Sequence, residues 1–512
     1  MCGFFASNDP FVNQDHLSLI NDRLSFRGPD FQSQLVSFKG WFLYHSRLSI
    51  IATEDEFSQP YFTQEGGALV FNGEILNYQE LAKKYGLGPM KSDTQVLGTL
   101  LSYEKFDLNE LEGFFSFVFI DQNGDLKYCA RDRLGVKPLN YIKREGYISI
   151  SSESSVLSDL FEIPYSDKAL EEYRVFRSPM FQGSYFEGVE SVEPGNCLIK
   201  GEYFNSLSLI PSKYLTSSDL LNKIKMTMEN AVSSRLIADV PVGLLFSGGI
   251  DSNLIKISTK REFACFTGGF IGDYDMDYAK NSLGEESNNI IVSDDDFLNR
   301  LQEMVKLRKE PLSVPNEVIL SFLAESWALK GGKVLLSGEA ADELFAGYDR
   351  IYYWALHTKE FNVQDFLSLY AYLPFKDISE EIIELVIDFF SELGTLSPFE
   401  KVRQFFIKKH LPVLFRRLDF SLMFSGIEGR EPFAATEVVK LALNLDPKDL
   451  FHGTLGKYPL RNLAKESLGE DFAFMPKVGF PIDMKKIIYG KESKSRLDNY
   501  LLWCDENMRL IR

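Results

Sequence analysis

The sequence holds few histidines and few cysteines, five of each in 512 residues. The cysteines form no Cys-x-x-Cys pair and the histidines form no metal-type cluster, which argues against a zinc site and a disulfide framework. Scattered thiols are typical of a reducing compartment, and any hydrolytic chemistry must find a base other than imidazole. The cysteines are Cys2, Cys129, Cys197, Cys265 and Cys504, and the histidines are His16, His45, His357, His410 and His452.

Positive charge is also in short supply. Lys and Arg number 55 against 73 Asp and Glu, which gives a formal net charge of -18. Non-specific nucleic-acid binding depends on clustered positive charge, so we expect no nucleic-acid partner. Apolar runs such as Gly113–Ile120 are far shorter than the roughly 18 residues of a membrane-spanning helix, and the first ten residues lack the segments of a secretory signal. We therefore expect a cytoplasmic protein with no membrane partner.

The pattern of apolar and turn-forming residues changes once along the chain. From about residue 40 to residue 200, short β-rich runs alternate with turn signals. A Ser-rich stretch, residues 204–220, is followed by helical and α/β patterns, and residues 361–445 are mostly amphipathic helix. We place a domain boundary near residue 205 and expect an α/β (α+β overall) protein.

A glycine-rich turn follows a short buried-strand run at residues 242–246. The turn SGGIDS comes directly before a helical segment, so its backbone N–H groups and the helix dipole point at one place, as in phosphate sites. Asp251 beside it suits a magnesium ion that bridges phosphates. The alternative is a tight turn without a ligand. No Gly-Lys-Ser/Thr follows, so the turn is neither a Walker loop nor a dinucleotide fingerprint.

A second strand-and-turn segment, residues 333–343, repeats the arrangement. After the strand come Ser337 and Gly338, and then Glu339, Asp342 and Glu343 at spacings that share one helix face. The carboxyl ends of neighbouring parallel strands meet at one sheet edge, so Asp342 is expected to reach the same magnesium ion as Asp251. A solvated helix start is the alternative.

Cys2 follows Met1 directly, and a small second residue favours removal of the initiator methionine. The chain would then begin with a cysteine whose own α-amine, with a pKa of about 7.7 to 8.0, relays the proton of the thiol. Such a nucleophile needs no histidine. The alternative is an ordinary frayed terminus.

Ten ordered motifs together resemble the glutamine-dependent asparagine synthetases over residues 2 to 485. The resemblance implies an N-terminal Ntn-hydrolase-type αββα sandwich acting as a class II glutaminase, residues 2–205. It also implies an α/β ATP-pyrophosphatase domain with a parallel sheet and a helical C-terminal part, residues 206–512. The motifs are MCGFF, FRGPD, HSRLSI, FNGEILNY, KSDTQV, RDRLGVKPLNY, SGGIDS, SGEAADELFAGY, EGREPF and PKVGFP.

The resemblance also implies roles for single residues in the first half. Cys2 attacks the carboxamide of glutamine, forming a glutamyl thioester and releasing ammonia. Asn72 and Gly73 match the oxyanion hole. Residues that match the site for the amino-acid end of glutamine are Arg47, Asn72, Glu74 and Asp93.

In the second half the resemblance implies ATP and Mg²⁺ as cofactors. Magnesium is assigned to Asp251 and Asp342, Glu339 matches a carboxylate near the acceptor, and Lys477 matches a lysine that steadies the intermediate or the departing pyrophosphate. An acyl-adenylate is needed because a carboxylate cannot lose oxide to ammonia. The residues matched to ATP binding are Leu245, Ser247, Gly248, Gly249, Asp251, Ser252, Ser337 and Gly338.

The chain departs from the family pattern at seven positions, among them Ala434 and Ala435, where Leu-Asp is common. Phe26 stands where histidine is usual, Gly268 replaces a branched residue near adenine, and Ala340 and Ala346 replace glycines. Glu431 stands where valine is common; it would disfavour dianionic aspartate if it faced the acceptor pocket and would mean nothing if it faced solvent.

The first hypothesis is therefore a cytoplasmic ligase of asparagine biosynthesis that consumes aspartate, ATP and glutamine. An amidotransferase acting on another carboxylate, such as a uronic acid of a surface polysaccharide, stays open, and so does a homodimer. Two other classes are disfavoured. A tRNA-modifying ATP pyrophosphatase would carry a basic face, and a scaffold protein would not retain Cys2, Asn72, Asp251 and Lys477 together.

Overall fold

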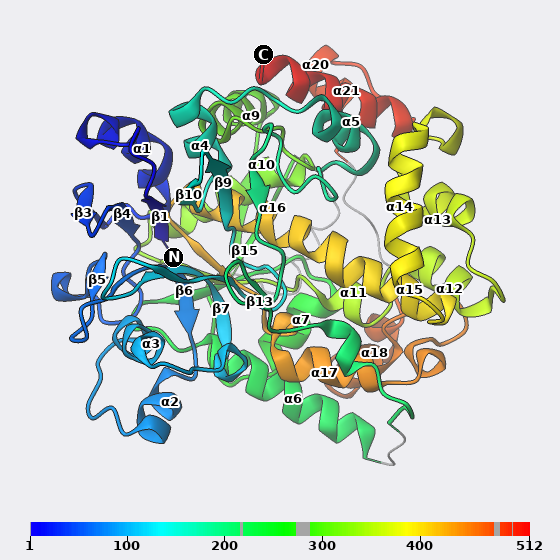
Figure 1. The fold of residues 1–512 in the computed structure, drawn as a ribbon. Helices are drawn as coiled ribbons and strands as arrows, with labels where there is room; N and C mark the ends of the chain where they lie inside the picture. The colour runs from blue at the N-terminus through cyan, green and yellow to red at the C-terminus, as the bar shows by residue number, and fades with distance from the viewer. Residues whose placement is uncertain (1, 216–218, 273–286, 476–481, 494) are drawn as a thin grey trace.

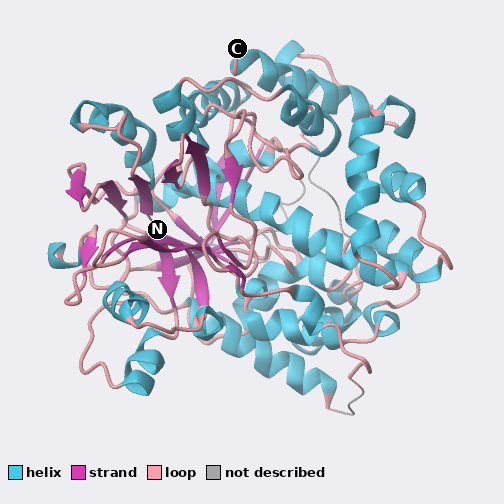
Figure 2. Cartoon of the chain, in the orientation of Figure 1, coloured by secondary structure: helices cyan, strands magenta, loops and turns pink. Residues whose placement is uncertain are grey.

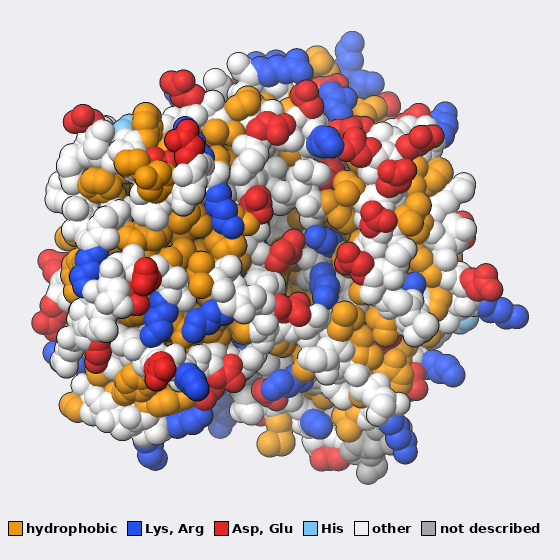
Figure 3. All heavy atoms as spheres, viewed as in Figure 1, with side chains coloured by type: hydrophobic (Ala, Val, Ile, Leu, Met, Phe, Trp, Pro, Cys, Tyr) orange, Lys and Arg blue, Asp and Glu red, His pale blue; other side chains and the backbone are white. Residues whose placement is uncertain are grey.

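The computed structural model describes residues 2–215, 219–272, 287–475, 482–493 and 495–512. These residues form two antiparallel β-sheets and one parallel β-sheet, with helices packed around them (Figures 1 and 2). Acidic and basic side chains are intermixed over the face shown in Figure 3. Within the described residues, no helix is both long enough and apolar enough to cross a bilayer.

The first antiparallel sheet has the order β11-β9-β10-β1-β4-β2, and β3 also pairs with β4. Strand β1 lies in the middle of this sheet and is buried along its whole length. Cys2 at its start is opposite Arg47 at the end of β4. The strands are β1 (Cys2–Ser7), β2 (Phe31–Gln32), β3 (Val36–Phe38), β4 (Trp41–Arg47), β9 (Asn140–Arg144), β10 (Tyr147–Ser151) and β11 (Glu190–Ser191).

The second antiparallel sheet has the order β13-β12-β8-β7-β6-β5. Its two long central strands pair over their whole length, from Ala68 opposite Ile120 to Ile75 opposite Gly113. The strands are β5 (Tyr61–Phe62), β6 (Ala68–Ile75), β7 (Gly113–Ile120), β8 (Leu126–Arg131), β12 (Asn196–Cys197) and β13 (Gly201–Glu202).

The two antiparallel sheets face each other and have helices on their outer sides. Alternate residues such as Phe4, Val70 and Val118 fill the layer between the sheets. Helices α1 and α4 pack against the first sheet, and α2 and α3 lie on the side of the second. This arrangement confirms the αββα sandwich. The N-terminal helices are α1 (Leu17–Leu24), α2 (Tyr78–Tyr85), α3 (Asp93–Ser102), α4 (Ser154–Phe161) and α5 (Asp167–Phe176).

The parallel sheet has the order β16-β15-β14-β17-β18 and lies in the second half of the chain, as expected. Strands β14 and β17 are neighbours, so the segments that follow them emerge at one edge. The strands are β14 (Val242–Leu245), β15 (Cys265–Gly269), β16 (Ser287–Ile291), β17 (Val334–Leu336) and β18 (Glu428–Arg430). The accompanying helices are α6 (Leu220–Arg235), α7 (Ile250–Ile257), α9 (Asp294–Arg308), α10 (Asn316–Ala328) and α11 (Ala341–Leu344).

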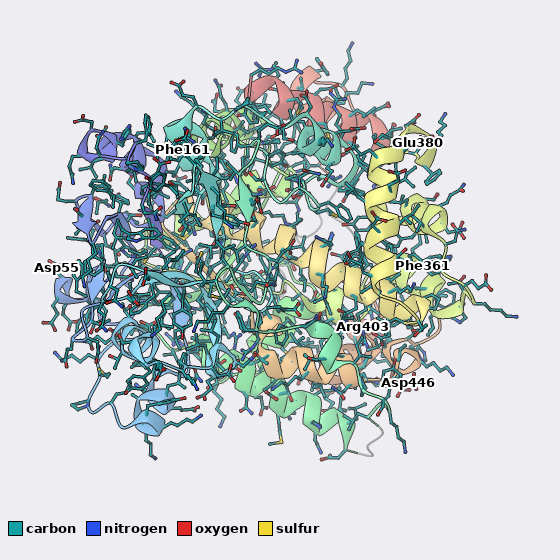
Figure 4. All side chains as sticks on the ribbon, in the orientation of Figure 1. Asp55, Phe161, Phe361, Glu380, Arg403 and Asp446 are labelled. Atoms are coloured by element: carbon teal, nitrogen blue, oxygen red, sulfur yellow. The ribbon has the colours of Figure 1, made fainter. Side chains whose placement is uncertain are left out.

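The C-terminal part is helical, which confirms the amphipathic pattern. Arg403 of α15, labelled in Figure 4, is fully buried and donates hydrogen bonds to the carbonyls of Ala442 and Leu443 near the end of α17. The helices are α12 (Asp349–His357), α13 (Val363–Tyr370), α14 (Glu380–Glu392), α15 (Pro398–Phe405), a π-helical turn (Phe406–His410), α16 (Leu411–Met423), α17 (Thr436–Asn444), α18 (Tyr458–Leu468), α19 (Glu470–Ala473), α20 (Met484–Tyr489) and α21 (Arg496–Leu510).

One apolar core joins the two halves of the chain. Its buried members include Leu48 and Phe117 from the antiparallel part and Val242, Phe345 and Phe433 from the parallel part. Because contact between the halves is apolar and continuous, they pack as one body with buried groups at their interface.

Candidate active sites

Cys2 lies in a closed environment at the start of β1. Its backbone nitrogen donates a hydrogen bond to Asn72 Oδ1 at 2.9 Å, and Arg27 Nε donates to its carbonyl oxygen at 3.1 Å. Burial raises the pKa of the Cys2 thiol, and the charge of Arg47 opposes that effect. The thiol is therefore protonated at neutral pH and needs a nearby base before it can attack.

Asn72 and Gly73 lie next to Cys2 on β6. Asn72 is fully buried, yet its Nδ2 has no hydrogen-bond partner among the described residues. Gly73 has φ +136°, and a Cβ there would stand 2.0 Å from the carbonyl oxygen of Phe114. A buried donor without an acceptor is costly, and an oxyanion hole waiting for its substrate has this property.

Besides Asn72, the residues matched to the amino-acid end of glutamine lie in the same region. Arg47 donates to the carbonyl of Glu54 at 2.8 Å and also contacts the carbonyl of Ala52. Asp93 accepts from the amide of Ile75 at 3.0 Å. Burial, and next the charge of Asp93, raises the pKa of Glu74 well above its usual range, and Glu74 Oε2 has no hydrogen-bond partner among the described residues. An ammonium group bound beside Glu74 would favour its ionised form and so oppose this rise in its pKa.

A cavity of about 480 Å³ opens at the carboxyl edge of the parallel sheet. Gly248 has φ +75°, which turns the chain between β14 and α7, and Gly249 precedes the first turn of α7. The N-terminus of α7 thus meets the cavity, an arrangement that favours anions. All eight residues matched to ATP line it, together with Glu339 and Asp342: Leu245, Ser247, Gly248, Gly249, Asp251, Ser252, Ser337 and Gly338.

Lys457 is a residue that the sequence reasoning missed. Its Nζ lies 2.7 Å from Asp251 Oδ2 and 2.7 Å from Asp342 Oδ1, so one ammonium joins the two carboxylates. Lys457 is 5% exposed, lines the cavity and directly precedes helix α18. A cation at a helix N-terminus opposes the helix dipole, and this local conflict was the available signal. Lys477, which was assigned the lysine role, lies outside the described residues.

Asp251 and Asp342 fit a magnesium ion that takes its remaining ligands from phosphates and water. Asp251 lies in the first turn of α7 and Asp342 in the first turn of α11, the helices that follow the neighbouring strands β14 and β17. Both carboxylates lie 2.7 Å from Lys457 Nζ. The described residues contain no group of three or more His, Cys, Asp or Glu side chains that could hold a metal by themselves. Among the described residues, Asp251 and Asp342 would supply the protein ligands of such a site.

The three acids after β17 do not share one helix face, contrary to the expectation. Helix α11 begins only at Ala341, so Glu339 precedes it and accepts from Arg417 Nη2 at 3.1 Å in the cavity wall. Glu343 is buried and accepts from Tyr348 Oη at 2.5 Å, and its pKa is raised by burial to about 8. Separation of the acids reduces the repulsion that a shared face would produce.

Ala340 and Ala346, which replace family glycines, both adopt positive φ, +79° and +60°. The left-handed region costs a residue with a Cβ about 1 to 2 kcal/mol. We expect Ala340→Gly to raise the free energy of unfolding by about 1 kcal/mol, measured by urea denaturation. Ala341→Gly in α11 is the control and should lower it by about 0.5 to 1 kcal/mol. If both variants changed the free energy of unfolding in the same direction, the backbone strain assigned to Ala340 would be contradicted.

Gly268 lines the cavity, but neighbouring side chains fill the space that a branched side chain at residue 268 would occupy. A Cβ at Gly268 would stand 2.6 Å from Leu323 Cδ2 and 3.2 Å from Ile319 Cγ2. Both neighbours also line the cavity. The apolar cavity surface that a branched residue at position 268 would provide is therefore supplied by side chains of α10.

Glu431 is 3% exposed and lies in neither of the two places considered from the sequence. It is absent from the lining of the large cavity and instead lines a second cavity of about 10 Å³ with Phe114 and Arg235, at the contact between the two halves. Its charge therefore gives no reason against aspartate as the acceptor.

Burial raises the pKa of Glu431 to about 7, with Lys137 opposing the change. In the unfolded chain its pKa is about 4.3. The stability due to the neutral acid is therefore complete below about pH 4.3 and is lost as pH rises to about 7.

We expect Glu431→Gln to leave the urea midpoint little changed at pH 4.5 and to raise the free energy of unfolding at pH 8, by about 4 kcal/mol at most. The control is Glu437→Gln, an exposed residue of α17 that pairs with Lys440. An equal effect of Glu431→Gln at both pH values would refute the assigned burial of the charge.

Comparisons with known proteins cover both halves. Residues 223–502 match the family model described as asparagine synthase, and residues 1–208 match the glutamine amidotransferase domain model. A Bacillus subtilis (strain 168) relative described as asparagine synthetase (glutamine-hydrolyzing) 1 is 32% identical over 395 residues, 70% of this chain and 61% of the relative. The match thus spans about three fifths of that relative's length.

Two further comparisons differ in coverage. An Acanthamoeba polyphaga mimivirus protein described as a probable asparagine synthetase (glutamine-hydrolyzing) is 28% identical over 495 residues, 91% of this chain and 82% of the relative. A solved structure of glutamine phosphoribosylpyrophosphate amidotransferase from B. subtilis is 18% identical, covers 50% of this chain and 63% of its own, and reaches a TM-score of only 0.27.

Proposed function

This chain belongs to the asparagine synthase family, with an N-terminal glutamine amidotransferase domain, and we propose from that premise that it is a glutamine-hydrolysing asparagine synthetase. Residues 2–205 would release ammonia from glutamine, and residues 206–512 would use ATP to transfer it to the side-chain carboxylate of aspartate. The observation that carries the proposal is the cavity whose wall holds the SGGIDS turn and the joined pair Asp251 and Asp342.

The glutaminase step follows from the groups around Cys2. With Met1 removed, the nitrogen that now donates to Asn72 Oδ1 is the α-amine, which takes the thiol proton as the sulfur attacks the carboxamide. Asn72 Nδ2 donates to the oxyanion, while Glu74 and Asp93 bind the substrate ammonium. The leaving nitrogen takes the proton from the amine, so ammonia departs neutral and a thioester remains for hydrolysis.

The synthetase step takes place in the 480 Å³ cavity. The backbone of the SGGIDS turn and the N-terminus of α7 bind phosphate oxygens, and Lys457 supplies a fixed cation where charge develops on the departing pyrophosphate. Asp251 and Asp342 would hold Mg²⁺, which neutralises phosphate charge when bound. Glu339, oriented by Arg417, lines the same cavity and would take a proton from the attacking ammonia.

The buried contact between the halves supports enclosed passage of ammonia, which bulk water would protonate. None of the five cysteines, all within the described residues, forms a disulfide. This supports the reducing cytoplasm that we propose as the location.

The test is pyrophosphate release from ATP, Mg²⁺ and glutamine, with and without aspartate, together with mass identification of the amide formed. Release that depends strictly on aspartate and yields asparagine supports the proposal. Glutamate formation without aspartate-stimulated pyrophosphate release would refute aspartate as the acceptor and direct the search to other carboxylates, uronic acids included.

A further inference from the structure

Helix α16, labelled near the centre of Figure 1, contacts both the large cavity and the N-terminal half. Arg417 and Leu418 line the ATP cavity, and Arg417 Nη2 donates to Glu339 there at 3.1 Å. The next two residues, Asp419 and Phe420, contact the N-terminal half instead. One turn of helix thus touches both parts of the protein.

Arg27 is the N-terminal partner of this turn and has no exposed surface. Its Nη1 lies 2.8 Å from Asp419 Oδ2 and 2.6 Å from Glu153 Oε1. Its Nε donates at 3.1 Å to the carbonyl oxygen of Cys2. The Arg27 side chain therefore connects Asp419 to the backbone of Cys2.

A second contact fixes the same two segments against each other. Phe26 packs edge-on against Phe420 with ring centroids 5.8 Å apart. Lys137 Nζ, also from the N-terminal half, lies 3.4 Å from Asp419 Oδ1. Asp419 is 4% exposed, so its attraction for Arg27 and Lys137 is little screened by water.

These contacts form a short connected path from the cavity to Cys2. A packed helix moves as a unit, so a shift of Arg417 when the cavity fills displaces Asp419 with it. Arg27 pairs with that carboxylate and donates to the Cys2 carbonyl oxygen, so a displacement of Asp419 would be passed to the Cys2 backbone. Displacement of a nucleophile by about 1 Å can lower the reaction rate about 100-fold.

We propose that Asp419 is a positioning residue: through Arg27 it sets the attack geometry of Cys2 and makes glutamine hydrolysis respond to the filling of the ATP cavity. The inference rests on the function proposed above and extends it to the regulation of the glutaminase site. Asp419 touches no reacting atom, and its influence on Cys2 passes through Arg27, which donates to the Cys2 carbonyl oxygen.

The experiment measures glutamate formation by the full chain with glutamine alone, with ATP and Mg²⁺, and with ATP, Mg²⁺ and aspartate. For the parent protein we expect kcat/KM to rise several-fold when the nucleotide is present. For Asp419→Asn we expect kcat for glutamine to fall about 10- to 100-fold with KM nearly unchanged, and the response to ATP to disappear. Ammonia-dependent pyrophosphate release should stay within about twofold.

The matched control is Asp159→Asn. Asp159 also joins the halves, through Lys309, and pairs with Arg23 at 2.6 Å, but it contacts neither site. This variant should keep the glutaminase rate and its response to ATP. Asp419→Glu keeps the charge but displaces it by one methylene. We expect it to fold with the parent's melting temperature and to lose the ATP response. This second variant keeps the inference testable if the Asp419→Asn protein fails to fold.

A double-mutant cycle with Arg27→Lys separates positioning from a merely structural role. If Asp419 acts through Arg27, the double variant is no slower than the slower single variant. Additive losses, a parent rate indifferent to ATP, or an equal fall of glutamine- and ammonia-dependent synthesis in Asp419→Asn would overturn the inference. A parent protein without any pyrophosphate release would instead refute the proposed function, a result visible before any variant is compared.

Discussion

Cys2→Ala is expected to abolish glutamine-dependent amide synthesis, by at least about 1,000-fold, while ammonia-dependent synthesis persists within about twofold. Alanine has no nucleophile, so no thioester forms and no ammonia is released. The 480 Å³ cavity proposed to bind ATP lies at the edge of a different sheet and retains all of its lining residues. Amide formation is measured by mass with glutamine or with ammonium salt as nitrogen source.

The ammonia-dependent rate of the same preparation serves as the control for folding. Cys2→Ser keeps a weaker nucleophile and should also be severely impaired with glutamine. Loss of both activities in a folded Cys2→Ala protein would show that the two reactions do not occupy separate sites.

Lys457→Ala should lower pyrophosphate release by about 100- to 1,000-fold with either nitrogen source and leave glutamine hydrolysis without ATP intact. Removal of one preorganised charge from a site of developing charge has an effect of this size. The variant also leaves Asp251 and Asp342 facing each other without the cation that now joins them. Pyrophosphate release and glutamate formation are followed in parallel assays.

Lys465→Ala is the matched control for this variant. Lys465 lies on the same helix, α18, is 45% exposed and pairs with Glu470 at 3.0 Å. It should keep full activity. If Lys457→Ala retained pyrophosphate release, Lys457 would be a structural counter-ion only, and the lysine role would pass back to a residue outside the described part of the chain.

Local patterns were enough to predict much of the fold. The strand expected at residues 242–246 is β14, Val242–Leu245, and the glycine turn leads into α7 as expected. Hydrophobic spacing and turn residues are local properties, so they can be read without long-range contacts. The parallel sheet and the αββα sandwich followed from ordered motifs of a known family.

Side chains joined across the fold could not be predicted in this way. Lys457 and Asp251 are 206 residues apart and come from segments without a shared pattern. The position of Glu431 at the contact between the halves depends on how β18 enters the parallel sheet. Arg27 and Asp419 likewise meet only when both halves are folded. The roles of the site residues matched by the family pattern stay predictions until the variants are assayed.

The continuous apolar core also limits how the protein can be taken apart. Leu48 and Phe117 share it with Val242, Phe345 and Phe433. Either half expressed alone would present this surface to water, and an exposed patch of that kind promotes aggregation. A protease that cut the chain near residue 210 would leave two fragments still bound to each other. Exchange of one half for that of a relative would therefore require a matching set of core residues, not only a compatible joining segment.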